Sequence, residues 1–343
     1  MLTPSSAQAR RQGPVCVITT ETNTTADRLV LALDALGTRV IRFDLADFPR
    51  RVVLDAVYRD GRISSTLTAR GRTADLDTIR SILWWHPGTP QITDPRLTPE
   101  QHRWVTAEAV TGLAGTLAAL DCLHVNHPVR TRAAQLKPDV LARAAGCGLA
   151  VPDTWIGNSP RGAFRFAAAA PEGVVCKSLT TPTITGPDGA PDPRHGIFFT
   201  QRVEATALDS RVSAGAHQLQ HRIEKDHEIR AVVVGDELFA ARIDAHSPAA
   251  REDFRADITS LTYERTTVPG DVHTGILRLM AHYALHYAAL DLVVDREGQY
   301  WLVDLNPAGQ YDWLQKDPPG LAVTDALAHF LTNGAPGPGR GGT

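Results

Sequence analysis

The sequence is poor in cysteine and lacks long apolar runs. Its 343 residues include four cysteines, none in a Cys-x-x-Cys pair, which argues against a disulfide framework and a structural zinc site. No uninterrupted apolar run reaches the roughly 18 residues that a membrane span needs. The first 14 residues lack the apolar segment of a secretory signal. We therefore expect a cytoplasmic protein without a membrane partner.

An excess of positive charge is also absent. Lysine and arginine total 35 and aspartate and glutamate 38, so the formal net charge is −3. A general nucleic-acid binder needs a basic face, so we expect no nucleic-acid partner. Two nucleotide-binding motifs are missing as well: the Gly-x-Gly-x-x-Gly fingerprint after the first predicted strand and the Gly-x-x-x-x-Gly-Lys-Ser/Thr loop. A nucleotide would have to be bound in another way.

Lysine is scarce beside 31 arginines, and the four lysines are Lys137, Lys177, Lys225 and Lys316. An ammonium group is a compact point charge that suits a phosphate in a confined site. Lys177 ends an apolar strand, where it needs an anionic partner. The alternative is that a given lysine is present on the surface by chance and has no special role. We interpret Lys225 as a solvated turn residue and Lys316 as a surface residue.

Hydrophobic periodicity and turn residues predict an α/β (α+β) chain. In the first part we expect strands at 15–19, 39–43 and 81–85, helices at 26–36 and 98–120, and a hairpin of 51–58 with 62–68. In the middle we expect helices at 131–145 and 161–169, strands at 154–156, 174–177 and 196–200, and a loop at 181–196. In the last part we expect strands at 217–223, 228–234, 237–243, 291–295 and 300–306, and helices at 273–290 and 322–331.

The composition along the chain suggests five segments. Residues 1–13 and 334–343 are expected to be disordered. The remaining segments are an N-terminal domain at 14–124, a central subdomain at 125–215 that carries the loop, and a C-terminal subdomain at 216–333.

A candidate metal site lies on the last hairpin. Asp304 and Asn306 share one face of a strand because side chains alternate. With a turn at 296–299, Asp291 falls opposite Asp304, and two like charges in that position repel unless a cation lies between them. Oxygen ligands of this kind suit Mg²⁺, so we predict a magnesium site at Asp291, Asp304 and Asn306. The alternative is that Asp304 is simply solvated.

The order of these motifs resembles the ATP-grasp superfamily. The matching features, from about residue 125 to 315, are Lys137 on a helix, Lys177 on a strand, a flexible loop, a hinge at 220–223, Glu228-Ile229-Arg230, Asp253-Phe254-Arg255, Asp291 and Asp304-x-Asn306-Pro307. The resemblance implies an ATP-grasp fold with an N-terminal pre-ATP-grasp βα domain, a central lid subdomain and a C-terminal antiparallel-sheet subdomain.

Further motifs resemble one branch of that superfamily. They are Trp84-Trp85, Val125-Asn-His-Pro128, Ala134-Gln-Leu-Lys137, Leu149-Ala-Val-Pro-Asp-Thr154 and Asn306-Pro-Ala-Gly-Gln-Tyr311. They are similar to graspetide synthetases, most of all the actinobacterial branch. These ligases install ester or amide crosslinks between side chains of a ribosomal precursor peptide that carries a leader.

The resemblance implies a role for each residue. Lys137 and Lys177 would contact the phosphates of ATP. Gln220, Arg222 and Ile223 would form the hinge, where Arg222 and Ile223 meet the adenine, and Glu228 would hold the ribose. The remaining roles fall to Arg230 and Arg255 near the transferred phosphoryl group and to Asp291, Asp304 and Asn306 as Mg²⁺ ligands.

Two residues depart from the family pattern. Asp304 stands where most relatives have glutamate, so a metal ion would lie closer to the strand. His86 stands where an arginine pair is expected. The resemblance also implies a homodimer or larger homo-oligomer. Two alternatives remain: a ligase that adds a free amino acid to a protein tail or another amino acid, and a non-catalytic ATP-binding module.

Overall fold

A computed structural model describes residues 13–180, 198–316 and 318–333. The predicted disordered ends, apart from residue 13, and the predicted loop at 181–196 lie outside these residues. Four sheets and eight helices are found in the described part of the chain, which confirms the α/β class. None of the helices there combines the length and apolar character needed to cross a membrane.

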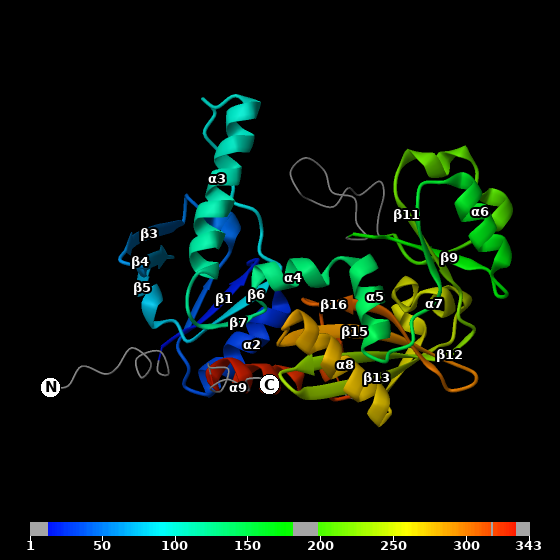
Figure 1. The fold of residues 1–343 in the computed structure, drawn as a ribbon. Coiled ribbons are helices and arrows are strands. Elements are labelled where there is room, and N and C mark those ends of the chain that lie inside the picture. Colours follow the sequence, from blue (N-terminus) through cyan, green and yellow to red (C-terminus); the bar gives the residue numbers. More distant parts are fainter. Residues whose placement is uncertain (1–12, 181–197, 317, 334–343) are drawn as a thin grey trace.

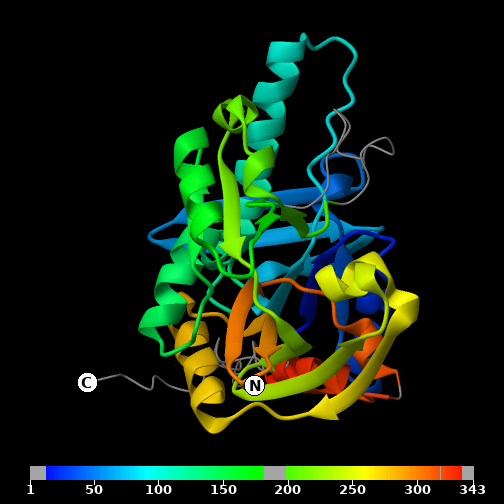
Figure 2. The ribbon, with the colours of Figure 1, turned by 90° about the vertical axis from the view of Figure 1, so that its right-hand side faces the viewer.

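The N-terminal sheet is parallel, with the strand order β2-β1-β6-β7. Its strands are β1 (Val15–Thr19), β2 (Val40–Phe43), β6 (Ser81–Trp85) and β7 (Leu123–Val125). Helix α2 (Thr24–Ala35) begins where the Asn23 side chain accepts a hydrogen bond from the Ala26 N–H, and it buries Leu29 and Leu33 against the sheet. Helix α3 (Pro99–Ala118) stands out from the body of the molecule (Figures 1 and 2).

A small antiparallel sheet flanks this domain. It consists of β3 (Val52–Arg59), β4 (Arg62–Ala69) and β5 (Arg72–Asp75). Asp60 and Gly61 join the first two strands with φ values of 52° and 72°, the positive values that a two-residue hairpin turn of type I′ requires. The predicted hairpin is therefore confirmed.

The central sheet is antiparallel, with the order β10-β9-β11-β8. Its strands are β8 (Thr154–Gly157), β9 (Val174–Lys177), β10 (Gln201–Val203) and β11 (His217–His221), and α6 (Pro160–Ala169) packs on one face. The predicted strand at 196–200 is wrong in its described part. The Thr200 N–H donates to the Asp253 carboxylate at 2.9 Å, and the strand begins one residue later.

The C-terminal sheet is antiparallel, with the order β14-β13-β12-β15-β16. Its strands are β12 (Lys225–Val234), β13 (Glu237–Ala245), β14 (Leu261–Thr266), β15 (Tyr287–Asp295) and β16 (Tyr300–Asn306). Helices α4 (Pro128–Ala134), α5 (Lys137–Gly146) and α8 (Gly270–Tyr283) cover one face. The short helix α7 (Pro248–Glu252) follows β13.

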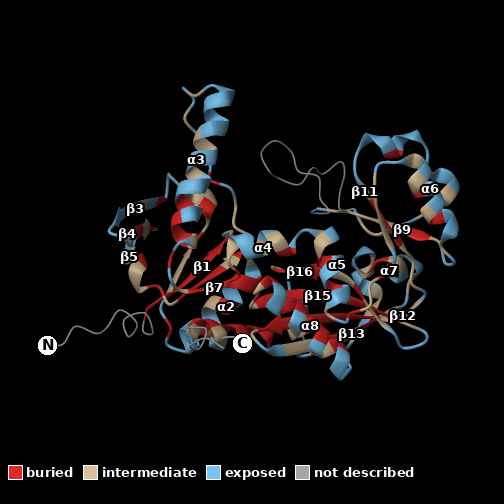
Figure 3. Ribbon diagram, viewed as in Figure 1, coloured by how far each residue is buried: buried red, intermediate tan, exposed pale blue. Residues whose placement is uncertain are grey.

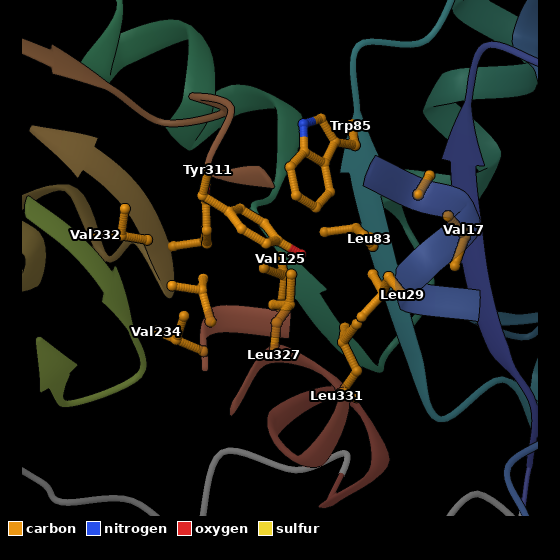
Figure 4. Close-up of a cluster of buried hydrophobic side chains, with 14 of the residues drawn as sticks. Val17, Leu29, Leu83, Trp85, Val125, Val232, Val234, Tyr311, Leu327 and Leu331 are labelled. Carbon is orange, nitrogen blue, oxygen red and sulfur yellow. The ribbon is translucent and has the colours of Figure 1, made fainter. Parts of the chain in front are cut away.

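The opposite face of this sheet packs against the N-terminal sheet and α9 (Val323–Asn333). Figure 4 shows side chains from both sheets meeting in one core around Trp85 and Tyr311, with Leu327 and Leu331 of α9 below them. Figure 3 shows the buried residues concentrated in these strands. The N-terminal and C-terminal sheets are therefore held together by a shared apolar core.

Two predicted helices have different limits in the structure. The helix predicted at 131–145 is split into α4 and α5, because Leu136 is not helical and Pro138 occupies the first turn of α5. The helix predicted at 273–290 ends at Tyr283, where Ala284 adopts left-handed φ and ψ values of 49° and 46°. The apolar residues 287–290 that prolonged the helical pattern belong to β15 instead.

Candidate functional site

A cavity of about 780 Å³ lies between the central sheet and the C-terminal sheet. Ten of the eleven site residues predicted from the sequence line it; the ten are Lys137, Lys177, Gln220, Arg222, Ile223, Glu228, Arg255, Asp291, Asp304 and Asn306. They come from α5, β9, β11, β12, β15, β16 and the connections between them, which lie on the right of Figure 1. The fold thus gathers residues from between positions 137 and 306 in one place.

Asp291 of β15 and Asp304 of β16 are direct partners across the two strands. Near the turn the register differs from the prediction, because Tyr300 pairs with Val294 and not with Asp295. A bulge between Asp291 and Leu292 restores the predicted pairing of the two aspartates. The sequence prediction is therefore right about the facing carboxylates and wrong about the ladder beside the turn.

Each of these two carboxylates has a cationic partner. Lys137 Nζ donates to Asp304 Oδ1 at 2.8 Å, and Arg230 donates to Asp291 Oδ1 at 2.7 Å. Burial alone raises the pKa of Asp304, but Lys137 and Lys177 outweigh it and hold that pKa below its ordinary value. Asp304 thus stays ionised inside the protein, as a metal ligand must be.

Lys177 connects the two sheets that border the cavity. Its Nζ donates to the main-chain carbonyl of Val303 at 2.7 Å, at the bulge of β16. Burial lowers the pKa of Lys177, and Asp304 opposes this effect. The Lys177 ammonium group therefore lies near Asp291 and Asp304 of the C-terminal sheet, although Lys177 belongs to the central sheet.

A further ion pair lines the cavity. Lys225 Nζ donates to Glu228 Oε1 at 2.5 Å, and both side chains are largely buried. Burial raises the pKa of Glu228 despite the attraction of Lys225. Gln220 donates to the Thr154 hydroxyl at 3.0 Å, and Arg222 lies 3.3 Å from Glu252.

Arg255 is held at the cavity by Asp253. Its Nε donates to Asp253 Oδ1 at 2.8 Å and its NH2 group to Oδ2 at 2.5 Å, a two-point contact that fixes the guanidinium plane. Burial alone would raise the pKa of Asp253, yet the bonds from Arg255 and from the Thr200 N–H bring it to about 2. Asp253 is thus ionised at neutral pH, and its carboxylate holds Arg255 in position.

Arg230 is the one predicted site residue that does not line the cavity. It is 8% exposed and lies behind Asp291, and its second nitrogen donates to the Gln310 carbonyl at 3.0 Å. Arg230 is therefore placed to orient Asp291.

The sequence analysis missed Lys225 and Asp253 as site residues. The interpretation of Lys225 as a solvated turn residue is wrong, because β12 begins at Lys225 and a register shift before His227 brings it to Glu228. The sequence carries no local signal of this contact, because residues three apart in a regular strand face opposite sides. Asp253 could have been found from its place two residues before Arg255 in a turn motif.

The oxygen donors of the site fit a hard divalent cation. Asp291, Asp304 and the Asn306 amide face the cavity from adjacent strands, and Mg²⁺ binds through few protein oxygens. The Asn306 Oδ1 also accepts the Ala308 N–H at 3.0 Å, which orients the amide. Such an ion would share the two carboxylates with Lys137 and Arg230, which now compensate their charge.

Comparison with known proteins agrees with the observed fold. Residues 15–132 match the family model of the MvdD pre-ATP grasp domain. A search of curated protein sequences gives no match. Many solved structures are similar to the chain.

Three of these structures illustrate the similarity. A RiPP-associated ATP-grasp ligase of Chryseobacterium gregarium, in complex with ADP and a leader and core peptide, is 26% identical, with a TM-score of 0.83 over 93% of this chain and 96% of that one. The macrocyclase MdnC of Microcystis aeruginosa MRC, bound with precursor peptide MdnA, is 24% identical, with a TM-score of 0.80 over 93% and 99%. The ATP-grasp ligase PsnB, complexed with minimal precursor, Mg and ADP, is 18% identical, with a TM-score of 0.69 over 96% and 99%.

The resemblance to peptide-modifying ATP-grasp ligases is thereby confirmed, while the actinobacterial branch stays a prediction. The fold, the pre-ATP-grasp domain and the neighbouring structures together identify the chain as an ATP-grasp ligase, of the ADP-forming carboxylate–amine/alcohol ligase class.

Proposed function

We propose that the chain is an ATP- and Mg²⁺-dependent ligase that closes ester or amide crosslinks within a ribosomal precursor peptide. The observation that carries this proposal is the single cavity in which Asp291, Asp304 and Asn306 lie beside Lys137 and Lys177. Acidic oxygen ligands and ammonium groups at such close quarters suit the polyphosphate of a nucleotide and its metal ion.

The cavity has room for a nucleotide whose ends meet different residues. We assign Lys137 and Lys177 to the phosphates and Glu228 to the ribose hydroxyls. The hinge residues Gln220, Arg222 and Ile223, at the end of β11 and just after it, would border the adenine. ADP in the Chryseobacterium ligase and Mg with ADP in PsnB support the use of ATP and Mg²⁺.

The chemistry follows from the weak electrophilicity of a carboxylate. Transfer of the γ-phosphoryl group of ATP to an Asp or Glu side chain gives an acyl phosphate, which a Thr or Ser hydroxyl or a Lys amine then attacks. Bound Mg²⁺ supplies charge stabilisation for the phosphoryl group. Arg255 faces the same cavity, fixed by Asp253, and would stabilise the charge of the transferred group, while Arg230 orients Asp291 from behind.

The proposed partner is a precursor peptide made of a leader and a core. Leader and core peptides occur in the Chryseobacterium complex, and precursor peptides in the MdnC and PsnB complexes. We further propose that the chain is divided into an N-terminal domain at 14–124, a central subdomain at 125–215 and a C-terminal subdomain at 216–333. We also propose that it forms a homodimer or a larger homo-oligomer. In the structure β11, which begins at residue 217, pairs with the central sheet, so the hinge between the last two subdomains would follow β11.

The test uses the purified protein, ATP, Mg²⁺ and the Thr/Asp/Glu-rich peptide encoded beside its gene. We expect the peptide to lose about 18 Da for each bond formed, as a dehydrating ligation requires. Asp304→Ala should abolish this loss, whereas Asp55→Ala, at an exposed site in β3, should not. ADP release with a gain of mass after addition of free amino acids would instead establish an amino-acid ligase, and ATP binding without either product would favour a non-catalytic module.

A further inference from the structure

A second cavity of about 430 Å³ adjoins the nucleotide cavity. Its lining comes from residues 20–25 around the start of α2, from His86 and from the segment 310–316. Besides His86, the lining carries hydroxyl, amide, carboxylate and ammonium groups together with one indole ring. His86 lines both cavities, so it stands where they adjoin.

The position of His86 is set by the fold. It follows β6 directly, at the carboxyl end of a parallel strand, where ligands of such sheets bind. Its φ of 49° is unusual for a residue with a side chain, and such conformations concentrate at functional sites. Its Nε2 lies 2.6 Å from the main-chain carbonyl of Ala308, two residues beyond Asn306.

This contact fixes the protonation pattern of the ring. A carbonyl oxygen can only accept a hydrogen bond, so Nε2 carries the hydrogen. In neutral His86 the lone pair therefore lies on Nδ1. The Ala308 carbonyl thus holds the imidazole in the tautomer in which Nδ1 can accept a proton.

The carboxylates that line the two cavities, as far as the chain is described, are already paired with cations. Each of the following lies within 3.3 Å of a lysine or arginine nitrogen: Glu228, Glu252, Asp253, Asp291, Asp304 and Asp312. The oxygens of these carboxylates are thus already occupied by contacts with the protein's own cations. His221 lines only the nucleotide cavity and packs its ring on Phe166 at 4.6 Å.

We propose that His86 is the general base of the ligation step, taking the proton from an acceptor hydroxyl or ammonium group that approaches through the second cavity. This inference rests on the proposed function. The acceptor oxygen or nitrogen forms a bond to the acyl carbon, and the bond from that carbon to the phosphate oxygen breaks. Inorganic phosphate leaves with the electron pair, and the proton moves to Nδ1 of His86 and then to solvent.

Two variants test this role. Asn tolerates left-handed backbone angles, so His86→Asn keeps the local conformation and removes the imidazole. His86→Gln supplies an amide of similar reach. The matched control is His102→Asn, because the Nε2 of His102 also contacts a main-chain carbonyl, that of Ile92 at 2.5 Å, and His102 lines neither cavity.

The experiment separates activation of the carboxylate from closure of the ring. Each protein is incubated with ATP, Mg²⁺ and the precursor peptide, with and without hydroxylamine, which is uncharged at neutral pH and traps an acyl phosphate as a hydroxamate without help from a base. For both His86 variants we expect hydroxamate formation within about twofold of wild type. Ring closure should slow by a factor of about 100 or more, the usual contribution of a general base. His102→Asn should match wild type in both assays.

The outcomes are distinct. If both His86 variants close rings at a rate close to that of wild type, or lose hydroxamate and ring to the same extent, His86 is not the base. If wild-type protein gives neither hydroxamate nor ring from the peptide, the proposed function itself fails, and the role of His86 fails with it.

Discussion

At the scale of single residues, the charged side chains at and behind the cavity wall form ion pairs with one another. Lys137 lies on Asp304, Arg230 on Asp291 and Lys225 on Glu228. A phosphate that takes Lys137 must draw it away from Asp304, and that carboxylate then needs another cation. The affinity of the site for nucleotide and for a metal ion should therefore be coupled, and the coupling must be reciprocal.

Asp304→Asn tests this coupling. The amide no longer holds Lys137 as an ion pair, so metal-free ADP should bind several-fold more tightly, equivalent to about 1 kcal/mol. Mg²⁺ should no longer strengthen ADP binding. Titration calorimetry with and without Mg²⁺ measures both effects, with Asp55→Asn as the control. Unchanged or weaker binding of metal-free ADP would show that Lys137 and Asp304 do not compete.

Asp253 gives a second prediction at this scale. Its pKa is about 2 in the folded protein, below its ordinary value near 3.8, so its ionised form stabilises the fold above about pH 4, and this contribution is lost as the pH falls toward 2. Asp253→Asn should lower the free energy of unfolding by about 2 kcal/mol at pH 7. Urea unfolding at several pH values measures this effect: the difference in the free energy of unfolding between Asp253→Asn and wild type should become smaller in acid.

Asp209→Asn is the matched control for this measurement. Asp209 also binds the arginine two residues later, with Arg211 Nε 2.9 Å from its Oδ1, but the pair lies in solvent. Exposed pairs contribute little, so stability should hardly change. Equal effects of the two substitutions would contradict the argument from burial.

At the scale of elements, sequence periodicity located most strands and helices but not every boundary. The strand at 81–85 and the hairpin around Asp60-Gly61 follow from local residues, and both are as predicted. The helix predicted at 273–290 failed because an apolar run gives the same signal in a helix and in a buried strand. The end of α8 depends on the conformation of Ala284 and on tertiary packing, which no local pattern records.

Ala284→Gly tests that account of the helix end. Ala284 adopts left-handed angles, and the Leu285 N–H closes the helix by donating to the Met280 carbonyl at 2.9 Å. Glycine meets no steric penalty there, so the free energy of unfolding should rise by roughly 0.5–1 kcal/mol. Ala281→Gly, at an exposed position in the last turn of α8, should lower it by a similar amount. A lower free energy of unfolding in Ala284→Gly would contradict the argument that the left-handed backbone of Ala284 is strained.

At the scale of the whole molecule, the sequence could supply the residue types of the site but not all of their contacts. The facing aspartates followed from strand alternation and an assumed turn, although a bulge is what aligns them. The position of Arg230 behind Asp291 and the contact of Lys225 with Glu228 depend on how strands twist and bulge. His86 reaches the site only because the N-terminal sheet packs on the C-terminal one.

This packing predicts that the two sheets unfold together. Leu331 of α9 is fully buried in the core shared by both sheets, and the hydroxyl of Ser81 in β6 donates to its carbonyl at 2.9 Å. Leu331→Ala should lower the free energy of unfolding by about 3 kcal/mol, whereas Leu31→Ala, at a 69% exposed site on α2, should change it little. In both proteins the unfolding curves from tryptophan fluorescence, to which buried Trp85 contributes, and from far-ultraviolet circular dichroism should coincide. Two separate transitions, with only the first shifted by Leu331→Ala, would mean that the N-terminal sheet is an independent unit and that His86 is not rigidly fixed to the nucleotide cavity.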